Sequence, residues 1–231
     1  MHRFVSKEGS GEWLIIRGDE LKHIKALRAK RGDPIEVFFN GKLYRAVLEN
    51  IERDKAVCKK LEELPQTLPL PHVVLYQCLP IELRLMEEVI DRASQVGAVS
   101  LVPVISRRSF KDTKLLEKKL ERWERISLSS FKQCKRPMPL KIEKPIRLQD
   151  LERREEISLL LDNFSAGKSI KEINLRAKSY GVLVGPEGGF SLEEVKELRD
   201  KGWISVFLRP YILRTEMAGA VAVAILMNLA D

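Results

Sequence analysis

Five short apolar runs, separated by helix-forming segments, dominate the sequence from residue 72 onward. Their apolar residues follow one another rather than alternate with polar ones, which indicates strands covered on both faces. Helices are predicted between them over Glu82–Val96 and Lys114–Gln133. Strands and helices in this order predict a parallel, doubly wound α/β sheet. Such sheets bind ligands beyond the carboxyl ends of their strands, where Asp162, Gly185 and Leu208 lie. The runs are HVVLYQCL, LVPVIS, ISLLLDN, YGVLVG and SVFLRP.

The first 63 residues have a different pattern, with short runs rich in Val, Ile, Phe and Tyr. Asn40-Gly41 between the second and third runs predicts a type I′ β-hairpin. The segment LPQTLPLP at 64–71 contains three prolines, which favour an extended connector. We therefore predict a β-rich domain over residues 1–68 and an α/β domain over residues 72–231. The β-rich runs are Glu12–Ile16, Pro34–Phe39, Leu43–Ile51 and Lys55–Leu61.

The positive charge of the chain is concentrated in one segment. Lys and Arg total 41 against 33 Asp and Glu, a formal net charge of +8. Residues 107–147 hold 14 basic and 5 acidic side chains, a net of +9, which leaves −1 for the remainder. Such a segment is typical of a surface that binds nucleic acid, although a solvated helix face explains the same charge.

Several classes of protein are not indicated by the sequence. The longest apolar stretch, Met217–Ala230, is shorter than the roughly 20 residues of a membrane span, and the first residues lack a signal-peptide pattern. Three scattered cysteines suit a reducing compartment. Three equally scattered histidines offer no zinc-ligand spacing. We expect a cytoplasmic protein with no membrane segment and no metal.

A glycine-rich turn, GPEGG at 185–189, follows the run YGVLVG and leads into a helix. Ser191 and Glu194 have the spacing of a capping box, and Phe190 can pack on Val195 as a hydrophobic staple. The turn matches neither the Walker A nor the G-x-G-x-x-G pattern, and Glu187 at its centre would repel a polyphosphate. A ligand with ribose hydroxyls, an adenine edge or a positive centre suits it better. An ordinary strand-to-helix turn is the alternative.

A second loop, FLRPYILRTEMAGA at 207–220, also joins a strand to a helix. Thr215 is a candidate N-cap, and Glu216 lies in the first turn, where the helix dipole favours an acidic side chain. Arg214 can stabilise developing negative charge beside a ligand. The small residues of Met217–Ala230 favour close packing, either in the core or at a subunit interface.

The two loops taken together resemble the RsmE family, the bacterial 16S ribosomal RNA uridine-N3 methyltransferases of the SPOUT superfamily. The resemblance rests on GPEGGFS and on I-L-R-T-E-x-A, carried here by Ile212–Ala218. It extends over the whole chain, because Met1-His2-Arg3-Phe4 is similar to the start of the family pattern and three further segments are similar to later parts of it. They are HIKALRAKRGDPIEVF, DRASQVGAVSLVPVISRRS and FKQCKRPMP.

The resemblance implies a PUA-like β-barrel that binds RNA, followed by a SPOUT-type α/β domain with a C-terminal trefoil knot. It also implies S-adenosylmethionine as the methyl donor, 16S ribosomal RNA or the small ribosomal subunit as substrate, and a homodimer whose active sites borrow from the partner. The implied catalytic residues are Arg214 and Glu216. The implied cofactor-binding residues are Leu161, Asp162, Gly185, Pro186, Glu187, Gly188, Gly189, Leu208, Arg209, Tyr211, Leu213, Arg214 and Thr215.

Contacts to RNA are assigned mainly to the basic segment. They are Arg3, Arg28, Arg107, Arg108, Lys118, Lys119, Arg122, Lys135 and Arg136.

The chain departs from the family pattern at the second loop. Relatives usually read L-G-x-R-I-L-R-x-E-T-A, whereas Arg209, Tyr211 and Met217 stand here in place of Gly, Arg and Thr. Two other functions therefore remain open. One is a SPOUT methyltransferase that modifies another RNA position, and the other is a non-catalytic RNA-binding protein of the same fold.

Overall fold

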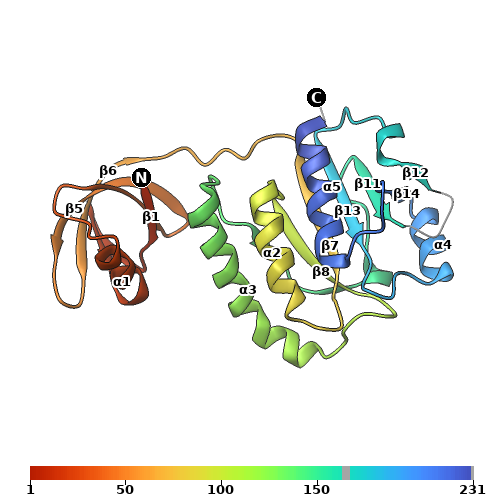
Figure 1. The fold of residues 1–231 in the computed structure, drawn as a ribbon, viewed down its shortest axis with the longest axis horizontal. Helices are drawn as coiled ribbons and strands as arrows, with labels where there is room; N and C mark the ends of the chain where they lie inside the picture. The colour runs from red at the N-terminus through yellow and green to blue at the C-terminus, as the bar shows by residue number, and fades with distance from the viewer. Residues whose placement is uncertain (163–166, 230–231) are drawn as a thin grey trace. The chain divides into compact units, whose positions relative to one another are not determined.

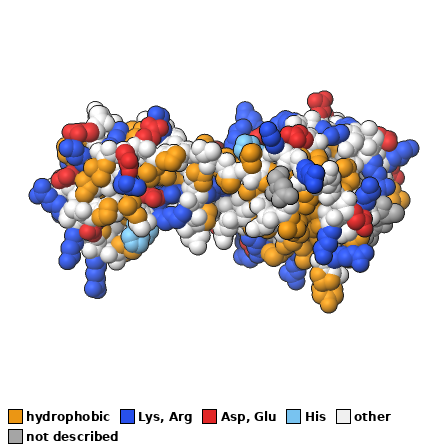
Figure 2. Space-filling model, turned by 90° about the horizontal axis from the view of Figure 1, so that it is seen from above, with side chains coloured by type: hydrophobic (Ala, Val, Ile, Leu, Met, Phe, Trp, Pro, Cys, Tyr) orange, Lys and Arg blue, Asp and Glu red, His pale blue; other side chains and the backbone are white. Residues whose placement is uncertain are grey.

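The computed structural model describes residues 1–162 and 167–229. Its contacts divide the chain into two compact units, Met1–Thr67 and Leu68–Asp231 (Figure 1). Lys and Arg side chains lie on both units on the face drawn in Figure 2, interspersed with Asp and Glu. The positive charge on this face is therefore not one continuous patch.

Unit 1 is built around a six-stranded sheet in the order β1-β4-β5-β6-β3-β2, in which only the β1–β4 pair is parallel. Buried side chains such as Phe4, Leu14, Ile16, Val37 and Leu48 form its core. The elements are β1 (His2–Val5), β2 (Glu8–Ser10), β3 (Trp13–Ile16), α1 (Gly18–Ala26), β4 (Pro34–Phe39), β5 (Lys42–Ile51) and β6 (Ala56–Glu63).

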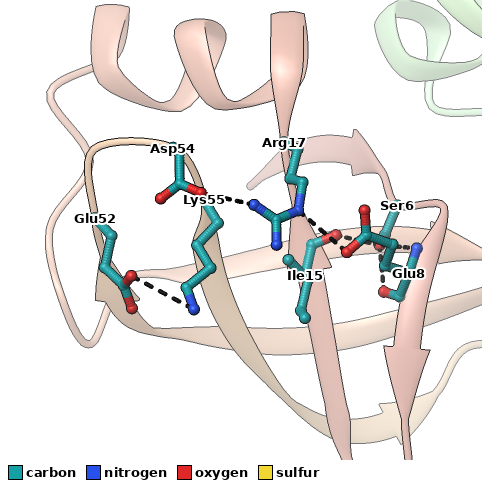
Figure 3. Close-up of polar contacts among 7 residues, drawn as sticks. All are labelled: Ser6, Glu8, Ile15, Arg17, Glu52, Asp54 and Lys55. Carbon is teal, nitrogen blue, oxygen red and sulfur yellow. Dashed lines mark hydrogen bonds and ion pairs between the residues drawn. The ribbon is translucent and has the colours of Figure 1, made fainter.

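Ser6 joins strands that lie far apart in this sheet order. Its backbone N–H donates to Phe38 O in β4 at 2.9 Å, and its hydroxyl donates to Ile15 O in β3 at 2.6 Å. Close by, the Arg17 guanidinium contacts Glu8 at 3.1 Å and Asp54 at 2.9 Å (Figure 3). These ion pairs are exposed and contribute little free energy. The buried Ser6 bonds therefore do more to hold the sheet in its curled form.

Unit 2 contains a sheet in the order β10-β8-β7-β13-β11-β14-β12, with β9 also paired to β8. Every strand pair in it is parallel, which confirms the predicted α/β sheet. Its strands are β7 (His72–Cys78), β8 (Ser100–Ile105), β9 (Lys141–Ile142), β10 (Ile146–Arg147), β11 (Ile157–Leu161), β12 (Lys168–Ser169), β13 (Ser179–Val184) and β14 (Ile204–Phe207). Short 3-10 turns lie at Leu148–Asp150 and Ile170–Glu172.

Helices cover both faces of the parallel sheet. Buried residues of α2 (Leu85–Val96), α3 (Thr113–Cys134) and α5 (Thr215–Leu229) share one apolar cluster with the strands. Val195 and Leu198 of α4 (Leu192–Asp200) belong to a second cluster. The continuous apolar runs of the strands are explained by this double coverage.

The small residues of α5 pack inside the chain. A Cβ on Gly219 would lie 2.8 Å from Leu75 Cδ1, so any larger residue here would require the Leu75 side chain or the helix to shift. Ala222 is fully buried in the same cluster. Core packing therefore explains this face of the helix within a single chain, while Ala230 of the predicted helix lies outside the described residues.

Candidate active site

A pocket of about 560 Å³ lies at the carboxyl ends of three neighbouring strands, β13, β11 and β7. Leu161 and Asp162 line it at the end of β11, and Val184 and Gly185 at the end of β13. The parallel sheet brings these ends together, as the sequence predicted. The other lining residues are Glu82, Leu85, Pro186, Glu187, Gly189, Phe190, Ile212, Leu213, Arg214, Thr215, Glu216 and Ala218.

Ten of the predicted site residues line this pocket, while four do not. Leu208, Arg209 and Tyr211 line a separate hollow of about 320 Å³ formed by residues 207–212. Ile212 borders both hollows, and Gly188 lines neither. The ten are Leu161, Asp162, Gly185, Pro186, Glu187, Gly189, Leu213, Arg214, Thr215 and Glu216.

The sequence analysis missed Glu82, Leu85, Val184, Phe190 and Ala218. Glu82 and Leu85 follow β7, which pairs with β13 in the sheet. The run HVVLYQCL was predicted as a strand, but the identity of the strands that pair with it in the sheet was not predicted. Once β7 is known to lie beside β13, the segment after it becomes an expected wall of the pocket.

The glycine turn is fixed by local bonds. The Gly189 N–H donates to Pro186 O at 2.9 Å, and Gly189 has a φ of +64°, which glycine adopts without strain. A Cβ on Gly185 would lie 3.0 Å from the Phe190 ring. Ser191 and Glu194 form the predicted capping box at the start of α4. Both ends of the turn are thus held by packing and capping.

Thr215 is not the N-cap that the sequence predicted. Helix α5 begins at Thr215, and the N–H groups of Met217 and Ala218 donate to Arg214 O. The buried Thr215 hydroxyl instead donates to Gly185 O at 2.6 Å and accepts from Gln77 Nε2 at 2.9 Å. This side chain therefore ties the second loop to the glycine turn and to β7.

Acidic residues predominate around the pocket. Glu82, Asp162, Glu187 and Glu216 line it against one guanidinium, that of Arg214, which gives a formal charge of −3. Like charges repel, so the pocket disfavours a polyphosphate and favours a ligand with a positive centre. This agrees with the expectation drawn from Glu187 alone.

Two of the arginines assigned to RNA, Arg3 and Arg136, are buried, which argues against a contact between either side chain and RNA. Arg3 is 5% exposed, and its Nε lies 2.7 Å from Glu36 Oε2. Arg136 is 8% exposed and donates to Ser94 O at 3.0 Å and Ala98 O at 2.6 Å. Burial lowers the pKa of Arg136. Its guanidinium therefore ties the segment after α3 to the end of α2 and to the residue that follows Gly97.

The other basic candidates reach the surface to different extents. Lys118, Lys135 and Arg28 are exposed, and Lys119 is half-buried. The exposed Arg122 side chain is paired with Glu87 through two contacts, at 3.3 and 3.0 Å. Its charge is therefore partly neutralised.

Arg107 and Arg108 contact the glycine turn and the helix that follows it. Arg108 Nη1 donates to Gly188 O at 2.7 Å. The Arg107 N–H donates to Glu194 Oε1 at 2.8 Å, and its guanidinium lies 3.4 Å from Glu193. The Ile81 N–H, in the segment after β7, donates to Glu187 Oε2 in the turn at 3.1 Å.

Within residues 1–162 and 167–229, no group of three or more His, Cys, Asp or Glu side chains is placed to hold a metal ion. In the same ranges, no helix has the length and apolar character needed to cross a membrane.

Comparison with known proteins decides the family. Residues 66–227 match a family described as an RNA methyltransferase domain, and residues 16–61 match an RNA methyltransferase PUA domain. Ribosomal RNA small subunit methyltransferase E of Aquifex aeolicus (strain VF5) is 42% identical over 228 residues, 99% of this chain and 100% of that protein. The chain belongs to the ribosomal RNA small subunit methyltransferase E family. The RsmE resemblance and the PUA-like first domain are thereby confirmed.

Other family members are also similar along their lengths. The family member of Mesomycoplasma hyopneumoniae (strain 232) is 31% identical, with 94% of this chain and 95% of that protein covered. The crystal structure of ribosomal RNA small subunit methyltransferase E from Neisseria gonorrhoeae, bound to S-adenosyl methionine, has a TM-score of 0.85. It is 25% identical and covers 99% of this chain and 98% of its own.

Proposed function

We propose that this chain is an S-adenosylmethionine-dependent methyltransferase that methylates uridine N3 in 16S ribosomal RNA of the small subunit. The observation that carries the proposal is the acidic pocket at the strand ends, in a chain 42% identical to ribosomal RNA small subunit methyltransferase E of Aquifex aeolicus. The uridine N3 position rests on the sequence resemblance alone.

The pocket fits the chemistry of S-adenosylmethionine. The sulfonium sulfur gives this molecule a positive centre, which the formal charge of −3 around the pocket favours. The backbone of residues 185–189 and of Leu213–Thr215, together with Asp162, would hold its adenosine and methionine parts. The Neisseria gonorrhoeae relative was solved with this molecule bound. When bound, it supplies the methyl group as an electrophile.

Arg214 is the proposed catalytic residue of this chain. Uracil N3 carries a proton, and its loss leaves negative charge spread over the ring nitrogen and the flanking carbonyl oxygens. The exposed Arg214 side chain borders the pocket, where a guanidinium stabilises this charge. Glu216, two residues later on the same pocket wall, orients Arg214 or accepts the proton.

We further propose a homodimer that acts in the cytoplasm, with a trefoil knot in the C-terminal domain and active sites that borrow from the partner. The less buried residues of α5, Met217, Val221 and Ala224, recur at helical spacing and offer an apolar face for a second copy. Lys118, Lys119, Lys135 and Arg122 are proposed to contact RNA phosphates.

Two measurements test the function. Calorimetry is expected to detect S-adenosylmethionine binding to the wild-type protein, and its absence would favour a non-catalytic RNA-binding protein. Mass spectrometry of ribosomal RNA from a deletion strain is expected to show one 16S uridine without its N3 methyl group. Loss of a methyl group elsewhere in the RNA would instead show that the chain modifies another position.

A further inference from the structure

Arg108 packs on the middle of the glycine turn as well as bonding to it. The residue lies in the loop between β8 and α3, and its Nη1 donates to Gly188 O at 2.7 Å. A Cβ on Gly188 would lie 3.3 Å from Arg108 Cδ and 3.7 Å from its Cβ. The aliphatic part of the side chain therefore covers the glycine while the guanidinium binds the carbonyl.

The bond from Arg108 gives the Gly188–Gly189 peptide a second hydrogen bond, at its C=O end. Gly188 C=O and Gly189 N–H belong to the same planar peptide unit. The N–H end donates to Pro186 O within the turn, and the C=O end accepts from Arg108. Glycines flank this peptide on both sides, so fewer steric contacts with side chains oppose its rotation. Arg108 opposes that rotation.

We propose that Arg108 is a positioning residue that fixes the Gly188–Gly189 peptide in the orientation that cofactor binding requires. The proposal rests on the proposed function, because it assigns the turn to S-adenosylmethionine. It replaces the expectation that Arg108 contacts an RNA phosphate. Gly189 lines the pocket, so a rotated peptide alters the polar groups that the pocket presents to a ligand.

Arg107 is the matched control for this proposal. It is the neighbouring residue with the same charge, and it is also exposed, but its guanidinium lies near Glu193 in the first turn of α4. Its bond to Glu194 uses the backbone N–H, which a side-chain substitution retains. Arg107→Ala therefore removes the same charge without removing a bond to the turn.

The test compares Arg108→Ala, Arg108→Met and Arg108→Lys with Arg107→Ala. We expect Arg108→Ala and Arg108→Met to weaken S-adenosylmethionine binding about tenfold or more, because a charge-assisted hydrogen bond is lost. Met keeps the packing on Gly188, so an equal loss in both variants assigns the effect to the hydrogen bond. Lys keeps a donor and is expected to restore part of the affinity. Arg107→Ala is expected to bind S-adenosylmethionine with the affinity of the wild-type protein.

Two further readouts separate positioning from other roles. Amide hydrogen exchange at Gly189 without any ligand should accelerate in Arg108→Ala and not in Arg107→Ala, and this result does not depend on the proposed function. The salt dependence of RNA binding should stay unchanged in Arg108→Ala. The proposal would be overturned if Arg108→Ala showed the wild-type rate of amide exchange at Gly189 and the wild-type affinity for the cofactor. A lower salt slope with intact cofactor affinity would overturn it in favour of a phosphate contact.

Discussion

Glu155 is a half-buried carboxylate that lies outside the pocket and against the sheet. Its Oε1 accepts from the Tyr76 hydroxyl at 2.9 Å. A Cβ on Gly181 would lie 2.6 Å from Glu155 Oε2, so the glycine in β13 makes room for this carboxyl group. Burial raises the pKa of Glu155, and the bond from Tyr76 and the nearby Arg154 oppose the rise. The neutral carboxylic acid is thus favoured more in the folded chain than in the unfolded one.

Glu155 therefore predicts a pH dependence of stability. A raised folded-state pKa adds stability below the unfolded value of 4.5, and this contribution is lost as the pH rises through the folded pKa. Glu155→Gln keeps an acceptor for Tyr76 and removes the charge. Denaturant unfolding from about pH 4 to about pH 8 should show the variant gaining stability relative to the wild type as the pH rises. A difference that stays constant with pH would contradict this.

Thr215 carries a second prediction at the scale of the residue. Thr215→Val keeps the shape of the side chain but leaves Gly185 O and Gln77 Nε2 without this partner. The expected cost is about 1–3 kcal/mol of unfolding free energy, together with weaker cofactor binding, because the two pocket loops lose their link. Thr215→Ser keeps the hydroxyl and should stay close to the wild type in both measurements. A stable Thr215→Val variant with full cofactor affinity would show that the link is dispensable.

The roles of single polar residues were the hardest feature to predict from the sequence. Arg136 and Lys135 are adjacent in the basic segment, yet Arg136 is buried on backbone carbonyls and Lys135 is exposed. Sequence gives the charge of a residue but not the direction of its side chain. The acceptors of Arg136, Ser94 O and Ala98 O, lie about 40 residues earlier in the chain, so no local pattern indicated them.

At the scale of the element, long apolar patterns predicted the strands of the pocket well. Runs covered on both faces are continuous, and β11, β13 and β14 are all present as parallel strands; the ends of β11 and β13 line the pocket, whereas Leu208 after β14 lines a separate hollow. The strands β1 and β2 were not predicted, because each has only three or four residues and no regular alternation. Short edge elements depend on their sheet partners, which a sequence window does not contain.

Helix α5 shows the limit of this approach. Its sequence is apolar nearly all round, so no polar face distinguishes its core side from an interface side. The structure makes that distinction, because Ala222 is fully buried whereas Ala224 is half-buried. Substitution of Ala222 therefore tests core packing, and substitution of Ala224 tests the proposed dimer interface.

Ala222→Glu is predicted to unfold the chain rather than only to separate subunits. A carboxylate at this position has no charged partner in the surrounding apolar cluster, and burying it costs at least about 3 kcal/mol. Circular dichroism and denaturant unfolding should show loss of the native fold.

Ala224→Lys should keep the fold and give monomers in sedimentation if this face joins two copies. A wild-type protein that sediments as a monomer at micromolar concentration would contradict the proposed dimer.

At the scale of the whole molecule, the positive charge and the acidic pocket require different partners. The chain has a net charge of +8, whereas the pocket lining has a formal charge of −3. A polyanion is attracted by the basic surface and repelled at the pocket, while a cationic ligand is favoured there. Added salt should therefore weaken both interactions by screening, the binding of RNA through basic residues and the binding of the cofactor through the acidic residues of the pocket.

Salt dependence of RNA binding tests whether the basic segment contacts phosphates. Lys118 and Lys119 project from the first half of α3, and neither belongs to the pocket. If both contact phosphates, Lys118→Ala with Lys119→Ala should reduce the slope of log affinity against log salt by about 1–2 units, because fewer condensed counterions are released. The matched control is Lys171→Ala with Lys196→Ala, which removes two exposed charges outside the segment. The control should keep the slope, and both double variants should keep cofactor affinity. An unchanged slope in the first variant would mean that this part of α3 is a solvated face.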